Sequence, residues 1–282
     1  MEEIIESYLD FAKKNPVYLL YSCVYFLLSV WLFQWQWWAW FMVAAVYAVA
    51  MIITFSPLGE WLMRTFNHVR PLDTAREINH LRPIFREAYG KAKAQNPELG
   101  QIDLYILDTM KVSSFALGNH TIAVSKGAMY TFSEEEMRAV FAHEIAHILN
   151  RDTAAALYAF VGNGVFMALI LPLKLGISVA QNIDSTRRAA DILDLVLGAV
   201  ISAFLFLMQI AQASSSRNAE NRADEYAVAL GYGEDLVEAL YLLEKLNLGG
   251  EGSIKKRLTA SHPRITARIG RLERLLGVMV VD

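Results

Sequence analysis

The sequence lacks several features that mark particular protein classes. It has a single cysteine, Cys23, so no intrachain disulfide can form and the fold cannot depend on one. It has no excess of basic residues, and its net charge of −3 argues against nucleic acid as a principal partner. Residues 15–59 contain no Asp, Glu, Lys or Arg at all. At ~1.5 Å per helical residue, this uncharged stretch is about twice as long as one crossing of a ~30 Å hydrocarbon core requires.

The uncharged stretch predicts a membrane hairpin. Residues 1–14 form an amphipathic lead-in, residues 17–33 a first span and residues 41–55 a second span. Residues 34–40 are rich in tryptophan and predict a tight turn in the interfacial belt, where amphipathic rings concentrate. A secretory signal peptide is the rival interpretation, but the acidic start and the lack of a small-residue cleavage site argue against it.

Two later apolar runs, residues 153–173 and 195–216, predict a second and weaker hairpin. A buried hairpin of a soluble domain stays open as the alternative for this pair. Basic residues flank the first hairpin on one side only, namely Lys13, Lys14, Arg64 and Arg70. If the spans number four, the positive-inside rule places both termini and the charged segment after the first hairpin in the cytoplasm, whereas Arg187 and Arg188 between the later runs count against this orientation.

The charged segment after the first hairpin predicts a helix followed by a small sheet. Residues 74–94 carry helical apolar spacing, and Pro83 inside them predicts a break or a new first turn. Residues 101–107, 114–118 and 121–125 read as strands, the last two joined by a Gly-Asn turn. An exposed edge strand can pair with an extended peptide, although strands that only cover the next helix would give the same pattern.

A His-Glu-x-x-His motif, His143 to His147, follows a helix start at Ser133 and Glu136 that has the form of a capping box. Helical phase puts His143 and His147 one turn apart on one face, where both imidazoles can share an ion. Two imidazoles, a third ligand and an open water position make a catalytic zinc site, and Glu144 suits the base that deprotonates the water. A chance match on an amphipathic helix is the alternative, so the motif needs a third ligand.

A second acidic helix, residues 216–231, offers that ligand. Glu220 and Asp224 share a face four residues apart, and Arg217 lies one turn earlier on it. One carboxylate can complete the metal's ligands while the other accepts a hydrogen bond from an imidazole. The alternative is an ordinary solvated helix. A final helix, residues 263–275, alternates arginine with apolar residues and suits either the anionic leaflet or the surface of the domain that carries the two helix motifs.

These two helix motifs together resemble the HtpX-like integral-membrane zinc metalloproteases, which belong to the same broad group as the CAAX prenyl endopeptidases. The resemblance implies that Glu220 is the third zinc ligand and Asp224 its second-shell partner. It further implies that His262, in Ser261-His262-Pro263, and Arg217 lie near the cleft and donate to the oxyanion. Substrate would bind along the strand Ser114-Phe115-Ala116, where family members often have Asn before Phe-Ala. Asn221 and Arg222 also depart from the family pattern, which often has an aromatic there.

The sequence thus predicts a mainly α membrane protein with about four transmembrane helices and a zincin-like α+β protease domain with a small sheet. The lead-in and first hairpin are expected in residues 1–59, and the second hairpin in residues 153–213. The protease domain is expected in two parts, residues 60–152 and residues 214–282. The expected function is a zinc endopeptidase with one Zn²⁺ per chain, set in the cytoplasmic membrane with its site facing the cytoplasm. The resemblance implies quality control of misfolded or damaged membrane proteins under stress. A narrow-specificity processing peptidase and a non-proteolytic scaffold with structural zinc stay open.

Overall fold

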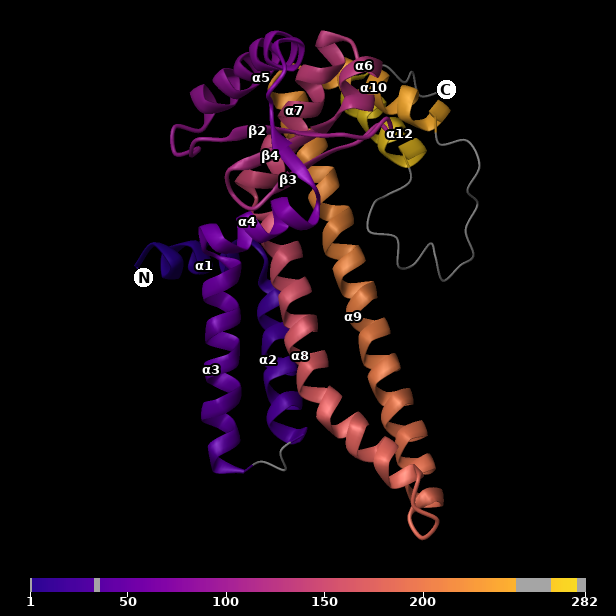
Figure 1. Cartoon of the computed structure of the whole chain (residues 1–282). Helices are drawn as coiled ribbons and strands as arrows, with labels where there is room; N and C mark the ends of the chain where they lie inside the picture. The colour runs from indigo at the N-terminus through magenta and orange to yellow at the C-terminus, as the bar shows by residue number, and fades with distance from the viewer. Residues whose placement is uncertain (1, 33–35, 247–264, 278–282) are drawn as a thin grey trace. The chain divides into compact units, whose positions relative to one another are not determined.

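The computed structural model describes residues 2–32, 36–246 and 265–277. The chain divides into two compact units, each built from two separate stretches (Figure 1). The helical unit comprises residues 1–56 and 155–212, and the sheet unit comprises residues 57–154 and 213–282.

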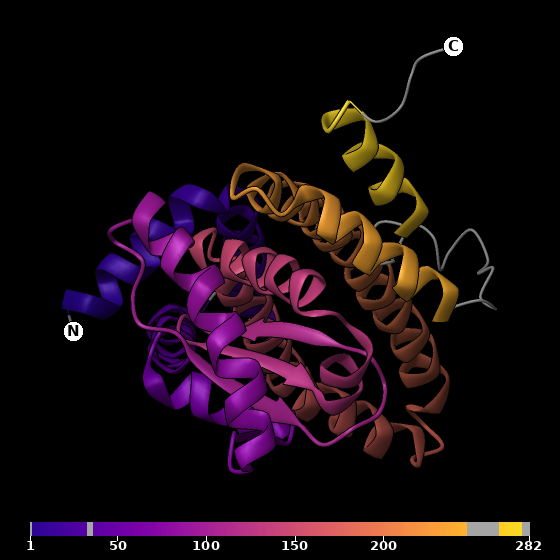
Figure 2. The ribbon, with the colours of Figure 1, turned by 90° about the horizontal axis from the view of Figure 1, so that it is seen from above.

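The sheet unit contains a four-stranded sheet in the order β1-β2-β4-β3, whose strands lie side by side in Figure 2. The strands are β1 Val69–Pro71, β2 Asp103–Leu107, β3 Ser114–Leu117 and β4 Thr121–Ser125. β2 and β4 are parallel, while β1 pairs with β2 and β3 pairs with β4 in the antiparallel sense. β4 is buried along its whole length, and β3 is the half-buried edge strand beside it.

Three of these strands match the predicted ones, and β1 was not predicted. It has only three residues and includes a proline, so it carries no alternating pattern that sequence could reveal. The antiparallel pairing of β3 with β4 places Phe115 opposite Ala123 and leaves the other side of β3 without a neighbouring strand in the described sheet. β3 therefore has the edge position that pairing with an extended peptide requires.

The sheet unit also contains helices that begin and end within it. They are α4 Pro57–Phe66, α5 Ala75–Gln95, α6 Lys126–Thr131, α7 Glu134–Leu149, α10 Gly233–Leu246 and α12 Ile265–Leu275. The predicted break at Pro83 is wrong, because α5 runs through it as one helix. A proline removes one hydrogen bond of the ladder, and the buried face of α5 (Leu81, Ile84, Phe85) holds the helix together across it.

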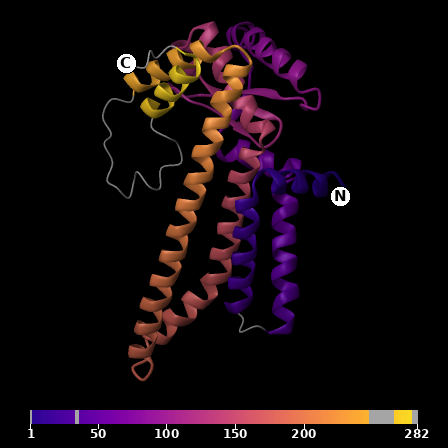
Figure 3. The same cartoon turned by 180° about the vertical axis from the view of Figure 1, so that it is seen from behind.

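The helical unit holds α1 Glu2–Lys14, α2 Pro16–Leu32 and α3 Trp37–Thr54, together with most of α8 Asp152–Gln181 and the first part of α9 Arg187–Ala229. Figure 3 shows α2, α3 and these parts of α8 and α9 as long rods. An aromatic cluster lies near the ends of several of them, with the Phe11 ring 5.3 Å from Phe55 and 5.4 Å from Tyr158.

Helices occupy all four predicted spans, but among the described residues only two segments are long and apolar enough to cross a membrane by length and composition. These are Trp37–Thr54 in α3 and Gly164–Gln181 in α8, the latter starting later than the predicted 153–173. Four crossings therefore remain a prediction. The tryptophan-rich turn is shorter than predicted, because Trp37–Trp40 already form the first turn of α3; Gln34 and Trp35 lie outside the described residues.

Candidate active site

The site is built on α7, a helix whose start and burial are both strongly determined. The predicted capping box is present: the Ser133 hydroxyl accepts from the Glu136 amide at 3.1 Å, and the Glu136 carboxylate accepts from the Ser133 amide at 2.7 Å. Beyond its first turn nearly every side chain of α7 is buried, and Phe141 packs edge-on against Phe85 of α5. A helix held at its start and packed on all sides cannot rotate, so its two histidines have one orientation.

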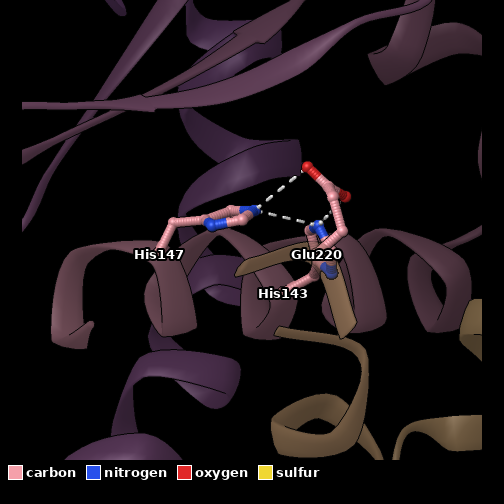
Figure 4. Close-up of side chains that lie close together, drawn as sticks. All are labelled: His143, His147 and Glu220. Atoms are coloured by element: carbon pink, nitrogen blue, oxygen red, sulfur yellow. Dashed lines mark hydrogen bonds and ion pairs between the residues drawn. The ribbon is translucent and has the colours of Figure 1, made fainter. Parts of the chain in front are cut away.

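Three side chains from two helices converge on one point (Figure 4). The Nε2 atoms of His143 and His147 are 3.2 Å apart, and Glu220 of α9 approaches with its oxygens 3.3 Å from His143 Nε2 and 3.7 Å from His147 Nε2. A tetrahedral zinc ion with ligands at ~2.0–2.1 Å keeps its ligand atoms about 3.3 Å apart. Two imidazole nitrogens and a carboxylate oxygen at this spacing fit zinc both in donor type and in geometry.

The outer nitrogen of each histidine is held by its own carboxylate. His143 Nδ1 lies 3.1 Å from Asp224, and His147 Nδ1 lies 3.0 Å from Asp152. A carboxylate beside Nδ1 favours the tautomer that carries its proton on Nδ1. The lone pair of Nε2 is then free to bind a metal ion. Asp224 has the position expected of it. Asp152 was not predicted, although it lies five residues after His147, where the chain enters α8.

Glu144, between the two histidines in sequence, is 6% exposed and is not one of the three converging side chains. Its carboxylate accepts a 2.7 Å hydrogen bond from the hydroxyl of Ser114, the first residue of the edge strand β3. The expected general base and the expected substrate strand therefore meet directly. The side chain of Ser114 thus reaches the site from the edge of the sheet.

Comparison with known proteins agrees with this geometry. The sequence pattern of peptidase family M48 matches residues 75–276, which include every residue of the site described above. The chain belongs to peptidase family M48. It is an HtpX-like member: it is 31% identical over 211 residues to Protease HtpX of Xanthomonas campestris pv. campestris strain B100, covering 64% of this chain and 69% of that one. It is 26% identical over 266 residues to the Protease HtpX homolog of Levilactobacillus brevis, covering 83% and 85%.

A solved structure shares the fold. The crystal structure of S. mikatae Ste24p matches with a TM-score of 0.56 at 19% identity, over 96% of this chain. This chain spans 65% of the length of that structure. The resemblance drawn from the two helix motifs is thus confirmed at the level of family, and the overall fold is one that a much more distant protein also adopts.

The structure of this M48 peptidase adds a residue that the motifs did not reveal, Arg268 of α12. Its guanidinium forms a forked ion pair with Asp224 at 2.5 and 3.0 Å, and its third nitrogen lies 2.9 Å from Glu220. Arg268 is itself nearly buried, with its side chain 10% exposed. It therefore joins Glu220 to Asp224, the carboxylate beside His143 Nδ1, so α12 contributes to the site from a distant part of the sequence.

A signal for Arg268 was present in the sequence. It lies next to the apolar stripe of its helix, whose members Ile269 and Leu272 are buried in the core of the sheet unit. The structure thus favours packing over the leaflet for this helix. An arginine beside a buried stripe has to find a buried acid, and Glu220 and Asp224 are such acids.

The carboxylates Asp224 and Glu220 have the dominant effect on the pKa of His143. Burial and the charge of Arg268 both lower the pKa of His143, but hydrogen bonds with Asp224 and Glu220 outweigh them and raise it to about 9. Burial raises the pKa of Asp224, but hydrogen bonds from His143 and Arg268 outweigh that effect and hold it below the usual value. Carboxylates that favour a proton on an imidazole so strongly also favour a metal cation in its neighbourhood.

The remaining predicted site residues are Phe115, Ala116, Arg217 and His262, and the structure describes all of them except His262. Phe115 and Ala116 lie on β3 and are half-buried. Arg217 lies on α9 one turn before Glu220, and in the described part of the chain it makes no hydrogen bond or ion pair; its role toward the oxyanion stays a prediction. His262 lies outside the described residues, so its predicted role is untouched.

Proposed function

We propose that this M48 peptidase is a zinc-dependent endopeptidase embedded in the cytoplasmic membrane, with its active site facing the cytoplasm. Residues 60–152 and 214–282 would form the protease domain, interrupted by the second hairpin, residues 153–213. The observation that carries the proposal is the pairing of a three-donor zinc set with Glu144, a buried carboxylate that is not one of the donors. A structural zinc site needs no such group.

His143, His147 and Glu220 would hold the ion. When bound, zinc would supply the Lewis acidity that makes a water molecule acidic enough to lose a proton near neutral pH. Glu144 would take that proton and later deliver it to the leaving amine of the cleaved peptide. Arg268 holds Glu220 and Asp224 in place during these steps, and Asp152 keeps the ring of His147 oriented.

Substrate would bind in extended form along β3. The free side of that strand offers backbone hydrogen-bonding groups, and Ser114 at its start contacts Glu144. A peptide that adds to this edge would pass the general base without needing a particular sequence, because backbone groups supply the pairing. This argument supports a protease that accepts unfolded segments of many membrane proteins, as quality control requires.

The decisive experiment compares Glu144→Gln with Glu135→Gln in detergent-purified protein supplied with zinc. Glu135 lies in the first turn of the same helix, where its side chain is 62% exposed, and serves as the matched control. We expect Glu144→Gln to retain about one zinc per chain and to lose cleavage of a model membrane protein by a factor of at least ~10². Glu135→Gln should cleave like wild type. Equal cleavage by all three proteins would mean a contaminating protease and would refute the assignment.

A panel of unrelated membrane proteins separates the remaining alternatives. Cleavage of several members, strongest for destabilised variants, is expected of a quality-control protease. Cleavage of a single lipidated or peptide substrate would instead indicate a narrow processing peptidase. Zinc binding with no cleavage by wild type, together with unfolding on zinc removal, would identify a structural scaffold.

A further inference from the structure

Helix α4, Pro57–Phe66, has its polarity reversed relative to an ordinary surface helix. Both of its charged residues, Glu60 and Arg64, face the sheet, and Glu60 is 7% exposed. The opposite face is open and mostly apolar: Leu58 is 51% exposed, Trp61 53% and Phe66 70%, and Thr65 is the exposed polar residue among them. A helix that faced water would carry these side chains the other way round.

The orientation of α4 is set by Glu60. Its carboxylate accepts from the hydroxyl of Thr121, from the backbone amide of Asn119 at 3.2 Å and from Arg64 at 3.2 Å. Gly118, in the turn between β3 and β4, allows this approach, because a Cβ there would lie 2.5 Å from the Glu60 carboxylate. These contacts fix one face of α4 to the sheet, so the apolar face cannot turn inward.

The position of α4 in the chain identifies what covers that face. The candidate span in α3 ends at Thr54, only four residues before Leu58. Four residues reach at most ~14 Å, a distance of the same order as the ~5–8 Å headgroup layer on each side of a bilayer. Trp61 on the open face is the residue type that concentrates at headgroup depth.

We propose that α4 is an interfacial helix, which sinks Leu58, Trp61 and Phe66 into the headgroup layer of a phospholipid bilayer at the end of the α3 span. The partner is the lipid surface itself. Its contact is mainly apolar, because the charged side chains of α4 are turned toward the sheet. Glu60 then links the lipid-contacting helix to the turn that begins β4 and ends β3.

Site-directed spin labelling tests this proposal. The single cysteine makes a Cys23→Ala background simple, and nitroxides are placed singly at Leu58, Trp61 and Thr65, all on the open face of α4. Arg86, exposed on α5, is the matched helical control. The full chain is reconstituted in nanodiscs of phosphatidylcholine and phosphatidylglycerol, and each label's accessibility to oxygen is compared with that to a water-soluble nickel chelate.

The expected result is an oxygen-to-nickel accessibility ratio several times higher at Leu58, Trp61 and Thr65 than at Arg86. Ratios equal to that of Arg86 would show that the face meets water and would overturn the proposal. Low accessibility to both reagents would show a protein covering the face, which overturns it equally. The three labelled positions are exposed, so unchanged thermal unfolding of each labelled protein verifies that the fold is intact.

Discussion

Two networks of charged side chains in the sheet unit both join carboxylates to basic residues, but they differ in the number of buried carboxylates for each cation. In the first, which we name the Arg70 cluster, Arg70 and Lys126 surround Glu77, Asp73 and Asp108. Only Glu77 is buried there, so one buried carboxylate faces two cations, while Asp73 and Asp108 are 64% and 50% exposed. In the metal-site cluster, Glu144, Glu220 and Asp224 are all buried, and Arg268 is the buried cation beside them.

The difference in balance separates a structural network from a functional one. Glu77 also accepts from the backbone amides of Asp73 and Thr74, so its hydrogen-bonding capacity is filled and the cluster stabilises the start of α5. The metal-site cluster keeps buried negative charge beside two imidazoles whose Nε2 atoms face each other at 3.2 Å. Buried carboxylates in excess of nearby cations create a site for a metal cation, whereas matched ones hold elements together.

Removing the guanidinium of Arg70 from the Arg70 cluster should have the largest effect. Arg70→Met leaves Glu77 buried without its main partner, which costs ~3 kcal/mol of unfolding free energy. For a unit of this size that corresponds to a fall in Tm of roughly 6–12 °C, measured by thermal unfolding in detergent. Arg82→Met, at an exposed position of α5, the helix that carries Glu77, should change Tm little. Weaker zinc binding by Arg70→Met would break the comparison, since this cluster should not affect the metal.

Removing one donor of the metal set should act on zinc rather than on the fold. Glu220→Gln replaces an anionic ligand with a neutral amide, and we expect zinc affinity to fall by more than ~10²-fold, beyond the range typical of outer contacts. Competition against a chelating dye measures it. Tm without added zinc should move by only a few degrees, because Arg268 keeps its forked pair with Asp224. Unchanged affinity would exclude Glu220 as the third ligand.

Arg268→Lys distinguishes orientation from charge within the metal-site cluster. Lysine keeps the positive charge but loses the fork that holds Asp224 and Glu220 together. We expect zinc affinity to fall about 10-fold, as for other groups that orient a ligand. Arg274→Lys on the exposed side of α12 is the control. If affinity is the same in both variants, Arg268 acts only as a counter-charge.

The smallest effect concerns pH. Hydrogen bonding from Arg70 lowers the pKa of Glu77 to about 2, against 4.5 as its ordinary value. A depressed folded-state pKa contributes stability that is complete above the ordinary pKa and is lost as pH falls toward 2. Unfolding free energy should therefore be about 1 kcal/mol lower at pH 4 than at pH 7 on this account alone. Denaturant titrations at both pH values measure it, and Glu77→Gln should show a pH dependence smaller by this amount.

Local patterns were sufficient for much of this protein. The start of α7 follows from Ser133 and Glu136, and the spacing of His143 and His147 puts them on one face, since both effects act within a turn or two of one helix. Glu220 and Asp224 could be paired for the same reason. The small sheet was largely predicted because β2 and β4 carry runs of β-forming residues, whereas β1 is too short to show a pattern.

What the sequence alone determined, then, is the chemistry of each helix: two imidazoles with a carboxylate between them, and two carboxylates on a second helix. Tertiary structure decided which of these groups meet. Asp152 and Arg268 complete the site from the start of α8 and from α12, and Ser114 reaches Glu144 from the edge of the sheet. The contacts of Ser114 with Glu144 and of Arg268 with Asp224 join residues 30 and 44 positions apart, and packing rather than local periodicity selects them.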